Sequence, residues 1–307
     1  FLTFGAEYQD NFKQVQTNFD PEPYVLYTDV HGRSERWGAF AQDEIKLAEP
    51  VMLYAGARLD HYDGFGYATS PRLALIYTPS PTTTFKALAG RAFRAPNEFE
   101  LHYEALGYKA NPRLEPEHIE TLELIAQRLV GGGVQISASA FRNRLTGLTD
   151  QLLDPADSLL RFVNLGDIRA RGLELGLEVN RGHGSSGQLS YSLQRTEERA
   201  TGTELTNSPG QIVQLQLRSA VPRLGAIAAL DAQYMSARRT LAGHSTNGHT
   251  LTNLSLFAPK ALGRFDLSGA LYNVFDTRYG DPVGDGYVQD VIRQDGRNVR
   301  VRATLHY

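Results

Sequence analysis

The amino-acid sequence predicts an all-β protein: an antiparallel transmembrane β-barrel, of which about fourteen strands are present. Three observations carry this prediction. Segments in which apolar and polar residues alternate recur along the 307 residues, and successive side chains of a strand point to opposite faces. The connections between these segments alternate between long and short. The polar face also carries more charged residues than a packed interior tolerates.

The end of the chain shows the alternation most clearly, over residues 297–307. One face carries only apolar or aromatic residues and the other only polar ones: Val299, Val301, Ala303, Leu305 and Tyr307 against Asn298, Arg300, Arg302, Thr304 and His306. A soluble sheet with its polar face in water has this pattern, and so does a barrel strand with its polar face in a wet lumen. Recurrence of the pattern therefore has to decide between them.

The pattern recurs, and each expected strand is justified by the apolar residues at every second position. Asp43 is the one charged exception on the apolar face of its strand. In chain order the apolar positions are Leu2, Phe4, Ala6, Tyr8; Trp37, Ala39, Ala41, Ile45, Leu47; Val51, Leu53, Ala55, Ala57, Leu59; Leu73, Leu75, Tyr77; Phe85, Ala87, Ala89; a segment over 117–127; Val134, Ile136, Ala138, Ala140; Leu173, Leu175, Leu177, Val179; Leu189, Tyr191, Leu193; Val213, Leu215, Leu217; Ala226, Ala228, Leu230, Ala232, Tyr234; Leu254, Leu256; Phe265, Leu267, Gly269, Leu271; and the final strand.

The connections alternate in length from the first to the last. The expected long ones are 11–33, 61–70, 95–115, 146–160, 196–210, 237–249 and 275–296, and the expected short ones are 48–50, 79–82, 130–133, 181–187, 221–225 and 258–263. Outer-membrane barrels have short periplasmic turns and longer extracellular loops. Aromatic residues beside the short turns, such as Tyr77 and Phe85, suit an interfacial girdle. A soluble up-and-down β protein is the alternative.

Composition excludes several other classes. Hydrophobic residues make up 41% of the chain, and no apolar run approaches the ~18 residues of a transmembrane helix. The net charge of −3 gives no sign of a nucleic-acid partner. Cysteine is absent, which excludes disulfides and thiolate metal sites and suits an oxidising compartment.

Seven stretches, in order, resemble the β-barrel of TonB-dependent outer-membrane receptors. They are Gly38-Ala39-Phe40-Ala41-Gln42-Asp43-Glu44, Gly56-Ala57-Arg58-Leu59-Asp60, Ser70-Pro71-Arg72-Leu73-Ala74-Leu75, Arg91-Ala92-Phe93-Arg94-Ala95-Pro96-Asn97, Leu114-Glu115-Pro116-Glu117, Asn164-Leu165-Gly166 with Arg171-Gly172-Leu173-Glu174, and Asn273-Val274-Phe275-Asp276-Thr277-Arg278-Tyr279. Each motif alone is weak, but the series is specific to the family and not to a ligand.

The resemblance implies a barrel of 22 strands plugged by an N-terminal domain. Residues 1–307 would then be the C-terminal part of the barrel domain, with the plug and the first strands absent. It further implies a receptor in the outer membrane of a Gram-negative cell that takes up a scarce ligand, a ferric siderophore first, or haem, cobalamin or a glycan. Its partners would be outer-membrane lipid, its own plug, an inner-membrane energy-coupling protein reached through the plug, and the barrel-assembly machinery. No cofactor and no enzymatic activity are expected.

The candidate ligand-binding residues are Arg94 and Asn97, expected where a strand becomes a long loop. Arg94 could meet an anionic ligand such as a ferric chelate, or it could pair with lumen carboxylates while Pro96 ends the strand. A second group is expected to face the lumen and either touch a plug or pair across strands. It consists of Gln42, Glu44, Arg58, Arg72, Glu123 and Glu174.

The final strand is expected to be the segment that the barrel-assembly machinery meets, through Val299, Val301, Leu305 and Tyr307.

Metal sites have little support. Asp281, Asp285 and Asp290 share a glycine-rich loop without the spacing of an EF-hand, and His244 and His249 share another loop. Two other functions stay open: a passive pore in which fourteen strands close on themselves, and a barrel-embedded enzyme, although no Gly-x-Ser-x-Gly motif is present.

Overall fold

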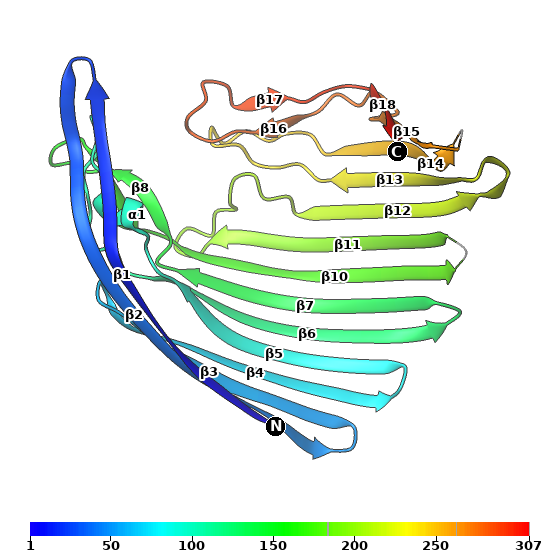
Figure 1. Cartoon of the computed structure of the whole chain (residues 1–307), viewed down its shortest axis with the longest axis horizontal. Coiled ribbons are helices and arrows are strands. Elements are labelled where there is room, and N and C mark those ends of the chain that lie inside the picture. Colours follow the sequence, from blue (N-terminus) through cyan, green and yellow to red (C-terminus); the bar gives the residue numbers. More distant parts are fainter. Residues whose placement is uncertain (183, 262, 307) are drawn as a thin grey trace.

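The computed structural model describes residues 1–182, 184–261 and 263–306. These residues form one curved antiparallel sheet of fourteen strands that follow one another in chain order (Figure 1). The number of strands and their antiparallel order confirm the fold class expected from the sequence. The strands are β1 (Leu2–Pro21), β2 (Tyr24–Ala48), β3 (Val51–Tyr62), β4 (Gly66–Ser80), β5 (Thr83–Arg94), β6 (Glu117–Gly131), β7 (Val134–Thr146), β10 (Asp167–Gly182), β11 (Ser185–Glu198), β12 (Gln211–Val221), β13 (Ala226–Met235), β14 (His249–Ala261), β15 (Phe265–Tyr272) and β18 (Asn298–Leu305).

Small elements occupy the connections. A short helix, α1 (Glu98–His102), lies between β5 and β6, and a 3₁₀ turn, η1 (Pro222–Leu224), lies between β12 and β13. Two small hairpins pair by themselves outside the main sheet: β8 (Thr149–Leu153) with β9 (Leu160–Asn164), and β16 (Gly280–Pro282) with β17 (Val291–Arg293). The sequence pattern predicted none of them, because each is too short to show a period.

Two expected long loops are wrong. Residues 11–33 continue β1 and β2 into a hairpin that projects beyond the other strands and turns only at 22–23 (Figure 1). Residues 61–70 likewise belong to β3 and β4, which turn at 63–65. The first hairpin carries polar residues on both faces, so alternation could not reveal it. Cross-strand contacts hold it instead: Tyr27 Oη donates to Asp20 at 2.6 Å and Arg33 to Asp10 at 2.8 Å.

The two ends of the sheet differ as expected in the remaining connections. Those at one end, on the right of Figure 1, are short: turns at 49–50, 81–82, 132–133 and 222–225, and the brief connections from β10 to β11 and from β14 to β15. The other end carries the long connections 95–116, 147–166, 199–210, 236–248 and 273–297. We call these the short-turn end and the long-loop end. Two residues of the expected short turns, His183 and Leu262, lie outside the described residues.

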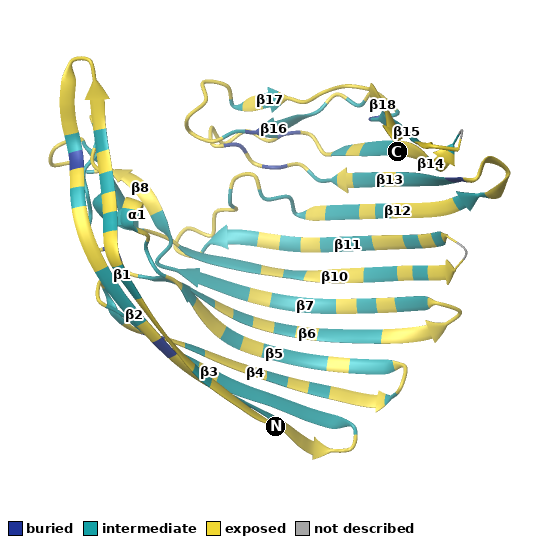
Figure 2. Ribbon diagram, viewed as in Figure 1, coloured by how far each residue is buried: buried dark blue, intermediate teal, exposed yellow. Residues whose placement is uncertain are grey.

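The two faces of the sheet have opposite character. Directly paired residues of neighbouring strands lie on the same face, and the register joins Leu53, Leu75, Ala87, Leu124 and Ala140 into one row. We call this apolar side the outward face. Its leucines are largely exposed, and among the described aliphatic and aromatic residues only Ala68, Leu114 and Ala226 are buried. The sheet is a single layer with no core of its own (Figure 2).

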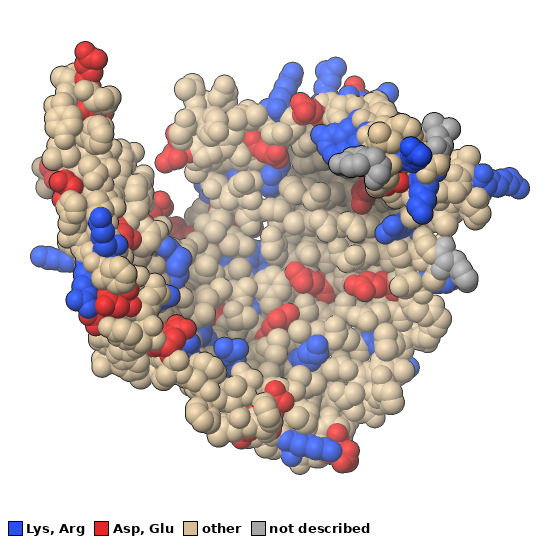
Figure 3. All heavy atoms as spheres, in the orientation of Figure 1, with Lys and Arg blue, Asp and Glu red and all other residues tan. Residues whose placement is uncertain are grey.

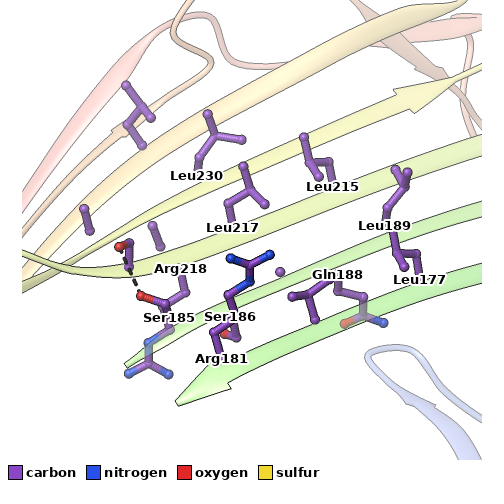
Figure 4. A pocket seen from close by; sticks show the side chains of 16 residues that line it. Leu177, Arg181, Ser185, Ser186, Gln188, Leu189, Leu215, Leu217, Arg218 and Leu230 are labelled. Atoms are coloured by element: carbon purple, nitrogen blue, oxygen red, sulfur yellow. Dashed lines mark hydrogen bonds between the residues drawn. The ribbon is translucent and has the colours of Figure 1, made fainter. Parts of the chain in front are cut away.

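Aliphatic side chains of β10–β13 lie side by side on the outward face and line a groove of about 600 Å³ (Figure 4). They include Leu177, Leu189, Leu215, Leu217 and Leu230. So much exposed apolar surface is unstable in water, and lipid is the medium that covers it. The opposite, polar face shows acidic and basic side chains over the middle strands (Figure 3).

The sheet is open. β1 and β18 are its first and last strands, and among the described residues each pairs with one neighbour only, β2 and β15 respectively. This agrees with the expected exposed edge. Within the described part of the chain, no helix has the length and apolarity to cross a membrane.

Candidate functional site

The connection between β5 and β6 folds back over the polar face at the long-loop end. Glu104 is its anchor: the carbonyl oxygen accepts from Thr28 Oγ1 at 2.7 Å and from Asn18 Nδ2 at 3.0 Å. Gln14 Nε2 donates to Glu98 at 3.3 Å. Asn18 and Thr28 oppose each other in the first hairpin, so this loop is tied to the projecting part of β1 and β2.

Asn97 begins α1 as its N-cap. Its side-chain oxygen accepts from the Glu100 backbone N–H at 2.9 Å, and the Glu100 carboxylate accepts from the Asn97 N–H at 2.9 Å. This reciprocal pair is a capping box. The Asn-x-x-Glu spacing was present in the sequence and could have revealed the helix start.

Arg94, the last residue of β5, pairs with carboxylates. Its Nε donates to Glu117 at 2.8 Å and its Nη1 to Glu100 at 2.9 Å. These ion pairs raise the pKa of Arg94 and lower the pKa of Glu117, for which the Arg94 hydrogen bonds are the largest cause. Of the two roles open from the sequence, the structure shows the pairing role. Together with Asn97, Arg94 fixes the start of the loop.

A hollow of about 590 Å³ lies beneath this loop, between it, the first hairpin and the β3–β4 turn. Arg36 is the residue of this hollow that sequence reasoning missed. It donates to Gln9 Oε1 at 2.8 Å and to the Tyr62 hydroxyl at 3.2 Å, and its guanidinium lies 5.8 Å from the Tyr62 ring centre. Within the described residues Arg36 forms no ion pair, although Glu35, Asp63 and Glu98 also line the hollow.

The six residues expected to face the lumen do share the polar face of the sheet. The register pairs Gln42 with Gly56 and Gly56 with Arg72, and the other members follow at every second position. Arg58 pairs with Asp60 at 2.6 Å and with Glu7. The side chains of the other five make no hydrogen bond or ion pair with any described residue. They are Gln42, Glu44, Arg72, Glu123 and Glu174.

The last strand places Val299, Val301 and Leu305 on the outward face, where they are strongly exposed. Tyr307, the fourth residue expected in this group, lies outside the described residues. The aromatic pair Tyr77 and Phe85 stacks on the outward face beside a short turn, with ring centres 6.1 Å apart.

The candidate metal loops are occupied by other contacts. Asp281 pairs with the buried Arg238, and Asp290 Oδ2 lies 3.0 Å from His244 Nδ1. His249 stacks on Tyr279 at 4.6 Å. Among the described residues, no three His, Cys, Asp or Glu side chains are grouped so that they could hold a metal ion. Among the described residues, no serine hydrogen-bonds to His244 or Asp290, as a serine nucleophile in an enzyme would.

Comparison with known proteins agrees with this architecture. Residues 1–274 match a family model described as "TonB dependent receptor-like, beta-barrel". The iron-regulated outer membrane virulence protein of Vibrio cholerae serotype O1 is 25% identical over 317 residues, which cover 94% of this chain and 47% of that protein. The ferric enterobactin receptor of Pseudomonas aeruginosa is 28% identical over 199 residues, 55% of this chain and 26% of the receptor.

Solved structures show the same fold. A mutant of the ferric enterobactin receptor from Pseudomonas aeruginosa superposes with a TM-score of 0.78 at 19% identity, covering 98% of this chain and 50% of that one. A copper transporter superposes with a TM-score of 0.74 at 16% identity, covering 99% and 54%. The chain spans about half the length of the proteins that it matches.

The family model covers all of the main sheet except its last strand, β18. Both this match and the fourteen-stranded sheet confirm what the seven sequence motifs indicated. The chain therefore belongs to the TonB-dependent receptor β-barrel family, a family of the outer membrane of Gram-negative cells.

Proposed function

We propose that this chain supplies fourteen strands of a larger barrel, in a receptor that takes up a scarce ligand at the expense of inner-membrane energy. The observation that carries the proposal is the single-layer sheet, apolar outside and charged inside, in which two strands have no second neighbour among the described residues. An open edge in lipid leaves backbone groups unpaired, at several kcal/mol each. Further strands between β18 and β1 would satisfy them.

A ferric siderophore is the ligand class with the most support. The relatives are named for iron regulation and for ferric enterobactin, and one solved neighbour holds enterobactin. The copper transporter has the same fold, so the barrel itself does not select the ligand. Haem, cobalamin and glycans are the alternatives to test.

Arg36 is the residue that we propose to meet an anionic ligand. It lies in the hollow under the β5–β6 loop, forms no ion pair with a described residue, and donates to the Tyr62 hydroxyl, which orients it. Arg94 and Asn97 belong to the same ligand site in this proposal. The ion pairs of Arg94 and the helix cap of Asn97 hold the loop over the hollow, and the Arg94 side chain is 45% exposed.

The polar face is proposed to meet a plug domain. The five lumen residues without a described partner are hydrogen-bonding groups available to a plug or to water. The plug would in turn contact an inner-membrane energy-coupling protein. Val299, Val301 and Leu305, on the edge strand β18, are proposed to meet the barrel-assembly machinery by strand pairing.

The test is uptake by a strain that expresses the receptor from its complete gene. We expect iron delivered as a ferric catecholate to enter in an energy-dependent manner, and Arg36→Ala to weaken ligand binding about tenfold or more, as for loss of a charged hydrogen bond. Arg223→Ala, in the turn η1 at the short-turn end, is the matched control and should bind normally.

Three results would contradict the proposal. Entry of ligand after the inner-membrane coupling protein is deleted would favour a passive pore. Competition by haem, cobalamin or a glycan, but not by ferric catecholates, would change the ligand class. Chemical turnover of the ligand by the purified receptor would favour an enzyme.

A further inference from the structure

The outward face changes abruptly on three neighbouring strands, β7, β10 and β11 (Figure 1). One row of cross-strand partners on them is apolar: Ala140, Leu173 and Leu193. In the next outward-facing row toward the long-loop end, the cross-strand partners are Arg142, Arg171 and Arg195. Three arginines thus stand side by side directly above an apolar row.

The next row toward the long-loop end mixes both charges. It joins Arg91 to Glu120, Glu120 to Arg144, Arg144 to Arg169 and Arg169 to Glu197, on β5, β6, β7, β10 and β11. We call the two rows together the arginine belt. It holds six arginines and two glutamates: Arg91, Glu120, Arg142, Arg144, Arg169, Arg171, Arg195 and Glu197.

Carboxylates compensate only part of this belt. Arg144 pairs with Asp167 at 3.0 Å, and Glu197 lies 2.9 Å from Arg195 and 3.8 Å from Arg169. Arg142 and Arg171 are exposed and make no ion pair or side-chain hydrogen bond with any described residue. As cross-strand partners their Cβ atoms lie ~4.5–5.5 Å apart, an arrangement that destabilises a sheet when the charges are alike. An anion between them would remove that repulsion.

An apolar groove of about 480 Å³ lies directly beneath the belt on the same face. Its lining includes Leu124, Ala140, Leu173, Leu175 and Leu193. Farther around the sheet, the strand pairing stops below the level of the belt: Gln211, the first residue of β12, is the partner of Leu193 in the apolar row, and Tyr234 of β13 and Thr250 of β14 lie in the row of Tyr191. The belt is therefore a local patch whose charged groups sit above a surface for hydrocarbon.

We propose that the arginine belt binds the phosphate groups of a lipid in the outer leaflet, with the lipid's acyl chains in the groove below. Guanidinium groups bind phosphate in bidentate fashion, and the change from apolar to arginine rows marks the edge of the hydrocarbon region, where headgroups lie. Charge complementarity and the adjoining groove both fit this occupant. The proposal depends on the sheet's orientation in the membrane and not on the uptake function.

The experiment uses the complete receptor in detergent, with bisphosphorylated lipid A and its dephosphorylated form as probes, and counts bound lipid by native mass spectrometry. We expect the wild-type receptor to prefer the phosphorylated form and to lose that preference at high salt. Arg142→Ala/Arg171→Ala should weaken lipid A binding about tenfold or more, while Arg142→Lys/Arg171→Lys should retain most of it.

The control is Arg128→Ala/Arg218→Ala, which removes one outward and one polar-face arginine near the short-turn end and should bind lipid A as the wild type does. Equal binding of both lipid forms by the wild-type receptor would overturn the proposal, and this measurement needs no variant. Undiminished binding by the alanine pair, or an equal loss in the control pair, would overturn it as well.

Discussion

At the scale of single side chains, the two faces of a strand impose opposite requirements on the same substitution. Leu175 lies on the outward face between Ala138 and Tyr191, and Ser190 lies on the polar face of the neighbouring strand. Arginine at position 175 would place a charge in hydrocarbon, whereas arginine at position 190 would meet the wet lumen.

We expect Leu175→Arg to lower the free energy of unfolding by ~2–4 kcal/mol if the site is near the bilayer midplane. Ser190→Arg should have a small effect. Denaturant titration of the complete receptor in lipid vesicles measures both. Equal losses at the two positions would show that the assignment of the faces is wrong.

A second residue-scale prediction concerns the ion pairs that hold the β8–β9 connection. Lys109 Nζ donates to Asp154 at 2.7 Å and to Asp157 at 2.6 Å. These hydrogen bonds lower the pKa of both aspartates and raise the pKa of Lys109. The stability that the two aspartates give to this connection is therefore complete above their ordinary pKa of ~3.9. It is lost as the pH falls through their lowered pKa values.

Proteolysis or hydrogen exchange of residues 147–166 should accordingly be independent of pH near neutrality and increase only when the pH falls below about 4. Lys109→Met should expose the same segment already at neutral pH, and its acid response should be weaker. An unchanged acid response in Lys109→Met would mean that other groups hold the connection.

At the scale of the elements, the capping box decides whether α1 forms. A helix of five residues has little stability of its own. We expect Asn97→Ala to cost about 1 kcal/mol locally, which hydrogen exchange over 98–103 would report, while Asn97→Asp should preserve the helix. Protection that is unchanged in Asn97→Ala would indicate that contacts from Glu104 to Thr28, not the cap, fix this segment.

The elements also show what the sequence could reveal. Strands in the apolar band were predictable, because lipid on one side and water on the other force a period of two, as in β18 and β10. The projecting part of β1 and β2 was not, because water surrounds both of its faces. Arg94 and Asn97 were placed correctly at a strand end, but their partner Glu100 depends on α1. Arg36 gave no signal, since the hollow in which it lies is formed by a loop about sixty residues away in the sequence.

At the scale of the whole molecule, the open sheet leads to a specific arrangement of its two edges. β1 and β18 each have one neighbour among the described strands, and the chain spans 47% of the relative from Vibrio cholerae. We therefore infer that further strands separate these edges in the complete receptor. The alternative is a narrow pore in which β1 and β18 pair directly.

The most direct test is disulfide cross-linking in the membrane-inserted, complete receptor. Phe4→Cys/Val301→Cys places thiols on the two edges, and a disulfide requires Cα atoms within ~7 Å. Leu175→Cys/Tyr191→Cys, on paired positions of β10 and β11, is the positive control. We expect the control to cross-link and the edge pair to remain reduced; efficient cross-linking of the edge pair would show that the fourteen strands close on themselves.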